Sequence, residues 1–211
     1  DNIMKAVSYL LSCNMGELFA LLIAILFGMQ APLLPIHLLW INLVTDSLPA
    51  LALGVDNAED DIMDRHPDMS GSLINKSMIW RIAYQGILVG GVTLVAYLYG
   101  MGTFGIHGGD SVEQGRTMAF VVLAFSQLIH SFSIHSSQKS VLTSFWKNKW
   151  LVLATVVNGL MILGVLFIPV LNDLFKLGRL DAHHWMIVGV LMFVPLVVVE
   201  IMKAFKLNGK H

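Results

Sequence analysis

The chain has 211 residues, of which 56% are hydrophobic and 13% charged, and its formal net charge at pH 7 is −1. Soluble domains have roughly a quarter of their residues charged, so this composition, with a mean hydropathy of +0.72, excludes an ordinary soluble domain and indicates a membrane protein. The balanced charge and the lack of a basic cluster argue against nucleic acid as a partner.

Six apolar stretches follow one another, and each is long enough, at roughly 17–25 residues, to cross a bilayer core. We expect helices over residues 5–27, 36–53, 78–100, 117–135, 150–170 and 183–204. The first stretch has no small-residue cleavage site and contains two polar residues, so it is a spanning helix and not a signal peptide. The expected fold is an all-α membrane protein, a bundle of six transmembrane helices.

The positions of lysine and arginine predict the orientation, because cytoplasmic loops carry an excess of these residues. With six crossings both termini lie on one side, and only Arg116, Lys176 and Arg179 fall on the other. We therefore expect both termini in the cytoplasm, together with segments 54–77 and 136–149.

Two carboxylates lie inside the first two spans. The short connection "GMQAPLLP" makes these helices antiparallel neighbours. At 1.5 Å per residue, Glu17 lies roughly 18 Å from Lys5, and Asp46 lies roughly 16 Å from Pro35. Both acids therefore reach the middle of the membrane, where an unpaired charge costs about 2.5–3.5 kcal/mol on insertion scales.

Neutral oxygen donors accompany these acids. Asn14 shares a helix face with Glu17, Asn42 shares one with Asp46, and Thr45 is adjacent. Such donors suit calcium, magnesium or manganese, and a proton is an alternative occupant. Hydrogen bonding between helices would account for the amides and the hydroxyl, but two acids without a base need a cation or a proton.

Pro49 interrupts the second span. It removes the backbone donor to the carbonyl of Thr45, so we expect a partly unwound helix around residues 45–48. Unwound carbonyls of this kind coordinate ions in transporters. No matching Pro-interrupted segment is expected in the second half of the chain.

Other polar and small residues in the spans have simpler interpretations. Gly86 and Gly90 share a face of the third helix, where another backbone can approach, and Gly16 is the partner we expect. Gln127, in the middle of the fourth helix, is either an ion ligand or an inter-helix hydrogen bonder. We expect His130 to be a hydrogen bonder, and Glu200 to pair with Lys203 near the membrane surface.

Three segments carry a family resemblance: "YLLSCNMGE" (9–17), "LLWINLVTDSLPALALGVD" (38–56) and "DIMDRHP" (61–67). They resemble the C-terminal membrane half of P-type calcium-transporting ATPases, from the fifth to the tenth membrane helix, and bacterial members in particular. The resemblance implies that residues 1–211 are a single C-terminal transmembrane domain and that segment 54–77 couples it to the phosphorylation domain. It also implies the set of ion ligands: Asn14, Glu17, Asn42, Thr45 and Asp46.

Gln127 departs from the pattern of the two-site reticulum pumps, which have a glutamate there, and resembles the plasma-membrane pumps, which have glutamine. We therefore expect one calcium per cycle, and the resemblance implies protons as counter-ions. The chain has no Asp-Lys-Thr-Gly phosphorylation motif and should not hydrolyse ATP alone. ATP and magnesium would act only in a full-length pump.

The partners implied by the resemblance are the lipid bilayer and the remaining N-terminal helices and cytoplasmic domains of the same pump, in a bacterial plasma membrane. Three alternatives stay open. One is a pump for manganese or another cation, the second is a self-contained six-helix channel or secondary carrier, and the third is a structural membrane module.

Overall fold

The computed structural model describes residues 2–56, 76–103, 111–135 and 147–205, and these form helices without a strand. Six helical spans in this part of the chain are long and apolar enough to cross a membrane. The predicted all-α bundle is confirmed. Residues 57–75, 104–110 and 136–146, which include most of the expected coupling segment, lie outside the described residues.

Four of the spans are continuous helices, and the other two are interrupted. The continuous ones are α1 (Asn2–Leu26), α4 (Lys76–Gly100), α5 (Val112–His135) and α7 (Lys149–Phe167). The second span consists of α2 (Pro35–Trp40), the π-helix η1 (Ile41–Thr45) and α3 (Ser47–Gly54). The sixth consists of α9 (Ala182–Leu191) and α10 (Val194–Ala204), and a short α8 (Pro169–Phe175) follows α7.

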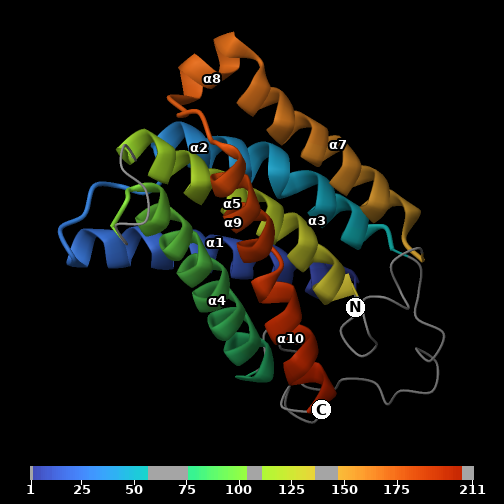
Figure 1. Cartoon of the computed structure of the whole chain (residues 1–211). Helices are drawn as coiled ribbons and strands as arrows, with labels where there is room; N and C mark the ends of the chain where they lie inside the picture. The colour runs from blue at the N-terminus through green and yellow to red at the C-terminus, as the bar shows by residue number, and fades with distance from the viewer. Residues whose placement is uncertain (1, 57–75, 104–110, 136–146, 206–211) are drawn as a thin grey trace, which may run out of the picture.

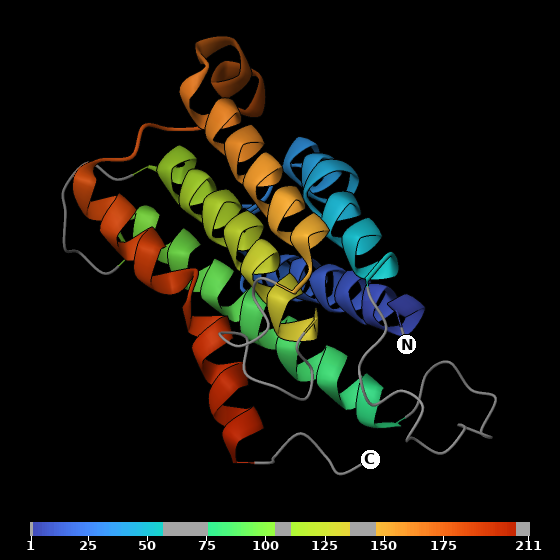
Figure 2. The same cartoon turned by 90° about the vertical axis from the view of Figure 1, so that its right-hand side faces the viewer.

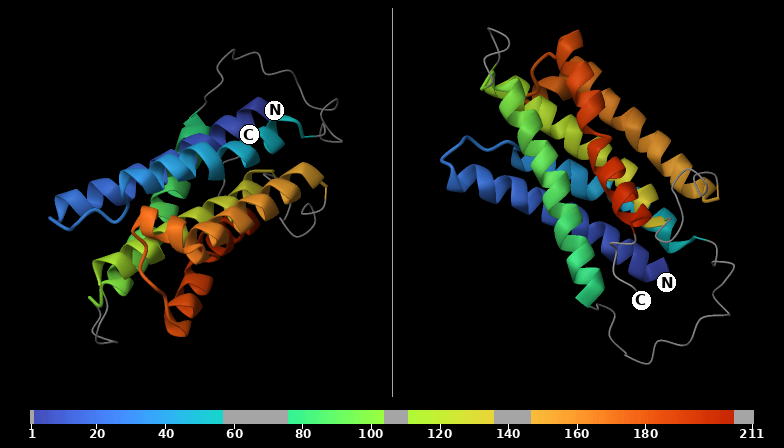
Figure 3. Two further views of the ribbon diagram at one scale, coloured as in Figure 1. Left: turned by 90° about the horizontal axis from the view of Figure 1, so that it is seen from above. Right: turned by 60° about the horizontal axis from the view of Figure 1, so that its bottom comes forward.

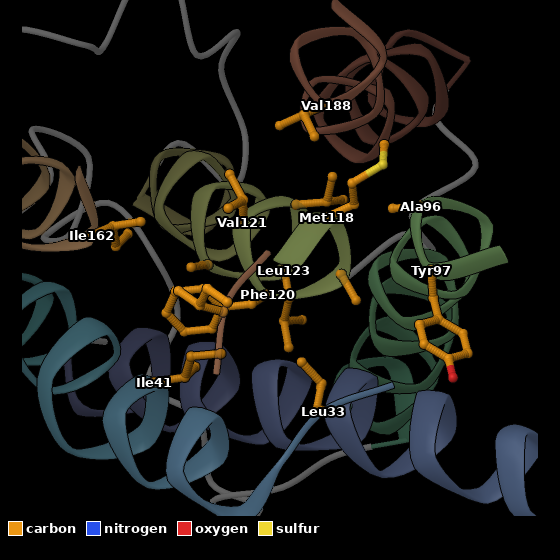
Figure 4. Packing of buried hydrophobic residues seen from close by; sticks show 14 of the residues in the cluster. Leu33, Ile41, Ala96, Tyr97, Met118, Phe120, Val121, Leu123, Ile162 and Val188 are labelled. Atoms are coloured by element: carbon orange, nitrogen blue, oxygen red, sulfur yellow. The ribbon is translucent and has the colours of Figure 1, made fainter. Parts of the chain in front are cut away.

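Helix α5 lies at the centre of the bundle (Figure 1) and contacts α1, η1, α3, α4, α7, α9 and α10. Figure 2 shows α5 and α7 side by side, and Figure 3 shows α4 crossing α1 on the other side of the molecule. In the main apolar core, Phe120 of α5 is turned toward Ile41, and Met118 lies near Val188 of α9 and Ala96 of α4 (Figure 4). The central helix therefore holds the two halves of the chain together.

The start of α1 and the end of α10 lie at the end of the bundle where α5 finishes. Asp56, after α3, accepts contacts from Nδ1 of His135 at 2.6 Å and Nζ of Lys5 at 4.0 Å. Lys203 of α10 donates to the backbone carbonyl of Ser133 at 3.0 Å. The start of α1 and the end of α10 thus lie on the same side, as an even number of spans requires (Figure 1).

The interruption of the second span begins before the expected residues. The backbone N–H of Asp46 bonds the carbonyl of Ile41 at 2.9 Å, one residue farther back than in an α-helix. Regular α-helix resumes at Ser47, with Ala50 N–H bonding the carbonyl of Asp46 at 3.1 Å. The wide turn therefore covers Ile41–Thr45, which carries Asn42 and Thr45, and ends next to Asp46.

Two other prolines interrupt helices in the second half of the chain, and neither interruption was predicted. The fifth span ends at Phe167, not at residue 170, because Pro169 starts α8 at its N-terminal position. The sixth span bends at Met192–Phe193, with Pro195 in the first turn of α10 (Figure 2). A second Pro-associated break therefore exists, in addition to the one expected at Pro49.

Close backbone contact joins α1 to α4 through glycines. A Cβ added to Gly90 would lie 2.5 Å from the carbonyl oxygen of Gly16, and one added to Gly86 would lie 2.6 Å from Cβ of Met15. An added Cβ at Gly16 would be 3.2 Å from the carbonyl oxygen of Gly86. The three glycines thus fix how closely α1, which carries Glu17, approaches α4.

Candidate functional site

The carboxylate of Glu17 lies between three spans and is held by two side-chain amides. Nδ2 of Asn42 donates to Oε2 at 2.8 Å, and Nε2 of Gln127 donates to Oε1 at 3.2 Å. Asn42 also donates to the carbonyl of Leu38 at 3.0 Å. Residues from α1, η1 and α5 therefore meet at one buried acid, with Glu17 only 5% exposed.

The second acid, Asp46, is fully buried where η1 meets α3. The hydroxyl of Tyr9 on α1 donates to its Oδ1 at 3.2 Å. Its Oδ2 has no hydrogen-bond partner among the described residues. Because native proteins pair nearly all buried polar atoms, a free carboxylate oxygen at this depth marks a place where a cation or proton can bind.

Thr45, next to Asp46, contributes two oxygens to this region. Its hydroxyl is buried and has no hydrogen-bond partner within the described ranges. Its backbone carbonyl, which Pro49 leaves without a helical donor, accepts a hydrogen bond from Nδ2 of Asn158 at 2.8 Å. The freed carbonyl is therefore bonded to α7.

The second, fourth and fifth spans each have a buried side-chain oxygen, from a hydroxyl or an amide, without a hydrogen-bond partner in the described residues. Oε1 of Gln127 and Oδ1 of Asn158 are buried without a hydrogen-bond partner in the described parts of the chain, as are the free oxygens of Thr45 and Asp46. All are hard donors. The described residues contain no cluster of three or more His, Cys, Asp or Glu suited to a metal, so a cation here would depend on the two acids and on neutral oxygens, a donor set that suits calcium more than zinc.

Asn14 is the one expected ligand that does not join the others. Its side chain is exposed, and its Nδ2 donates to the carbonyl of Leu10 at 2.9 Å, within its own helix. Leu11, Leu18 and Leu22 are exposed on α1 as well, at 39%, 59% and 49%. Asn14 thus lies on a side of α1 that no other described helix covers.

His130, Glu200 and Lys203, the other polar residues singled out from the sequence, each form a side-chain contact in the structure. His130 lies 3.2 Å from Oγ of Ser12, so it bonds α5 to α1 as expected. Glu200 and Lys203 form an ion pair at 2.7 Å. Since Lys203 also reaches Ser133, this pair is partly buried against α5 and is not simply solvated.

Sequence reasoning missed Tyr9 and Asn158. Tyr9 has the pattern of an ordinary buried aromatic, and Asn158 is a single amide in an otherwise apolar helix. The carbonyl orphaned by Pro49 was a usable signal, because a buried carbonyl requires a donor. It does not indicate which helix supplies that donor.

Comparison with known proteins identifies relatives of the whole chain. Residues 30–205 match the family described as cation transporting ATPase, C-terminus. Calcium-transporting ATPase 1 of Bacillus cereus is 38% identical over 98% of this chain and 25% of its own length. The calcium-transporting ATPase of Bacillus subtilis is 33% identical over 92% of this chain and 22% of its own length.

A more distant match bears a different cation in its name. The sodium/potassium exporting P-type ATPase of Schizosaccharomyces pombe is 28% identical over 98% of this chain and 23% of its own length. The chain thus spans about a quarter of the length of these curated relatives.

Proposed function

This chain belongs to the cation-transporting P-type ATPases, whose C-terminal membrane region it matches, and on that premise we propose that it forms the ion-binding part of a calcium-exporting pump. The observation that carries this proposal is the pair of buried acids, Glu17 and Asp46, on neighbouring spans beside a π turn. Their hydrogen-bond partners in the described residues are amides and a phenol, with no basic side chain among them.

The donor set supports calcium as the transported ion. Calcium takes six to eight oxygen ligands in flexible arrangements, and Glu17, Asn42, Thr45, Asp46 and Gln127 offer carboxylate, amide and hydroxyl oxygens. The names of the two Bacillus relatives point to the same ion. Manganese is the alternative, since it accepts similar ligands, and the Schizosaccharomyces relative shows that other cations occur in related proteins.

Ion binding at Glu17 would exchange hydrogen bonds for ligands. Both of its oxygens accept amide N–H groups from Asn42 and Gln127. A cation at this carboxylate would displace those N–H groups, and the amides could then turn their oxygens toward it. The same carboxylate can therefore be held by hydrogen bonds after the ion leaves, which suits a ligand that binds and releases the ion in each cycle.

We propose one calcium per cycle, with protons as counter-ions. Gln127 is neutral, so the region around Glu17 has one charge fewer than it would have with a glutamate at position 127. Asp46, with a free oxygen and the hydroxyl of Thr45 beside it, is then the centre of the single site. Protons returning to Glu17 and Asp46 would compensate their charge when calcium is released.

The setting of this domain follows from the same premise. We propose that residues 1–211 are one membrane domain in a bacterial plasma membrane, with both termini in the cytoplasm. The further helices of the pump would cover the exposed side of α1, where Asn14 lies. Phosphorylation by ATP with magnesium would occur in other domains, and the segment at 54–77 would transmit it.

A secondary carrier is the competing function, and the bend at Met192–Phe193 is the one observation in its favour. Carriers built from inverted repeats place broken helices at a shared binding site. The bend in the sixth span contains no acid between Val188 and Val197, and Ser126 reaches the carbonyl of Met192 at 3.4 Å. It therefore lacks the charged groups of the first break, and the pump is the better supported function.

The test is ATP-driven uptake of calcium-45 into vesicles containing the full-length pump. Asp46→Asn should abolish uptake while expression and folding stay normal. Asp173→Asn, the same chemical change at an exposed acid of α8, should leave uptake unchanged. Undiminished uptake in Asp46→Asn would overturn the proposed site, and a Gln127→Glu variant with unchanged calcium per ATP would count against the one-ion proposal.

A further inference from the structure

The hydrogen bond between Asn158 and the carbonyl of Thr45 joins α7 to the interrupted second span. The side chain of Asn158 is 1% exposed, and its Nδ2 lies 2.8 Å from the carbonyl oxygen. No residue of the expected ligand set lies on α7. The contact is the point at which this helix reaches the residues of the proposed ion site.

The backbone itself supplies no donor for this carbonyl. In a regular helix the N–H of residue 49 would bond it, but residue 49 is proline. The next N–H, that of Ala50, is already bonded to the carbonyl of Asp46 at 3.1 Å. Asn158 therefore takes the place of the missing backbone donor.

The chemistry of the amide fixes its orientation. A carbonyl only accepts hydrogen bonds, so the NH₂ group of Asn158 must face Thr45 and its Oδ1 must face away. Because the site is buried, a residue without a donor would leave the carbonyl unpaired, and an unpaired buried acceptor is more costly than an ordinary lost hydrogen bond. The local backbone would then move to find another partner.

We propose that Asn158 is a positioning residue for ion binding: by substituting for the donor that Pro49 lacks, it holds Thr45 and Asp46 in the arrangement that accepts the cation. This inference rests on the proposed pump function. In this proposal the N–H group of Asn158 does not contact the ion. Helix α7 thus acts as a support for the turn that bears the ligands.

The effect on ion binding follows from populations. If the turn spends only a fraction of its time in the competent arrangement, the apparent dissociation constant rises by the inverse of that fraction. An unpaired buried carbonyl shifts such an equilibrium by roughly a factor of ten. We therefore expect Asn158→Leu, which keeps the volume and removes the donor, to raise the calcium concentration for half-maximal uptake roughly tenfold.

The experiment is a double-mutant cycle with Pro49→Ala in the full-length pump. Alanine at position 49 restores a backbone N–H that can bond the carbonyl of Thr45, so Asn158 is no longer the sole donor. Pro49→Ala will itself alter calcium affinity, but adding Asn158→Leu to that variant should change the affinity little further. Asn158→Ala, which adds no bulk, provides a second test if the leucine variant does not fold. Thr155→Val is the matched control on α7, since its hydroxyl bonds the carbonyl of Leu151 within the same helix, at 2.9 Å.

Suppression of the Asn158 effect by Pro49→Ala supports the inference, because a purely packing role would give additive effects. Wild-type affinity in both Asn158 variants, or additive losses, overturns it. The same four proteins can be compared by thermal unfolding without calcium. Pro49→Ala should suppress the loss of stability caused by Asn158→Leu there too. If wild-type vesicles take up no calcium, the proposed function fails on its own, and the stability cycle still decides the role of Asn158.

Discussion

The hydroxyl of Tyr9 donates a hydrogen bond to Oδ1 of Asp46 at 3.2 Å, and both side chains are fully buried. The bond joins α1 to the end of the π turn, so one oxygen of the acid is fixed by a neighbouring helix. The other oxygen has no hydrogen-bond partner in the described part of the chain. The bond to Oδ1 thus fixes the orientation of the carboxylate, and Oδ2 can bind an ion or a proton.

Tyr9→Phe should therefore weaken ion binding as well as stability. Removal of a donor to a buried carboxylate costs about 1–3 kcal/mol, and loss of orientation should lower calcium affinity roughly fivefold. Titration of calcium-dependent ATP hydrolysis and thermal unfolding of the full-length pump measure the two effects. Tyr97→Phe is the control, because Tyr97 donates to the carbonyl of Gln30 at 2.9 Å, away from the acids. Equal calcium affinities for the two variants would contradict this role for Tyr9.

Gly90→Ala should destabilise the contact between α1 and α4. The new Cβ would lie 2.5 Å from the backbone carbonyl of Gly16, which cannot move without displacing α1. Overpacking of this kind costs typically about 1–3 kcal/mol. Gly91→Ala is a control from the same helix, since its Cβ would meet nothing within 4 Å, and alanine favours the helix by up to about 1 kcal/mol. Thermal unfolding should separate the two variants, and a shared melting temperature would contradict the close-packed interface.

Asp181 should make the start of α9 sensitive to acid. The backbone N–H of His184 donates to its Oδ1 at 2.8 Å, and this bond lowers the pKa of the carboxyl below its ordinary 3.8. A lowered pKa means that the cap stabilises the helix above that value and loses its effect as the pH falls through the folded pKa. The protection factors of the amides in the first turn of α9, which are corrected for the intrinsic pH dependence of hydrogen exchange, should therefore fall on acidification. Asp181→Asn keeps an acceptor without a charge, so an equally steep pH dependence in that variant would contradict the assignment.

Asn14→Ala should reduce calcium affinity less than Asn42→Ala does. Asn42 donates to Glu17 at 2.8 Å, whereas Asn14 is exposed and bonded within its own helix. Parallel titrations of calcium uptake in the full-length pump provide the comparison. A loss for Asn14→Ala as large as that for Asn42→Ala would mean that Asn14 turns toward the ion when the pump's other helices cover α1.

The spans were predictable because hydropathy over a long window reflects bilayer thickness directly. Their interruptions were predictable only in part. Pro49 stood three residues after an acid and was interpreted as a break, but Pro169 and Pro195 had no acid beside them inside the predicted spans, which were extended through them. A proline also does not determine which kind of interruption forms. Here the interruption is a π turn at Ile41–Thr45, which comes before Pro49 in the sequence.

The two acids of the site were evident from sequence because charge is rare inside apolar helices. Their supporting residues were not. Asn158 is 113 residues from Thr45, and its partner is a backbone atom, which carries no residue-specific signal. Tyr9 and its bond to Asp46 depend on how α1 faces α3, which the close glycine contact with α4 helps to set. Such pairings emerge only from tertiary packing.

The central position of α5 has a consequence for how the protein is made. During synthesis α5 precedes α7, α9 and α10, which cover much of its surface in the finished bundle. Until they arrive, the hydroxyl of Ser126 lacks the carbonyl of Met192 that accepts its hydrogen bond in the finished bundle, and an unpaired polar group is costly in lipid. Biogenesis should therefore keep α5 beside α1 and α4, its contacts already translated, and close the bundle around it when the last helices enter the membrane.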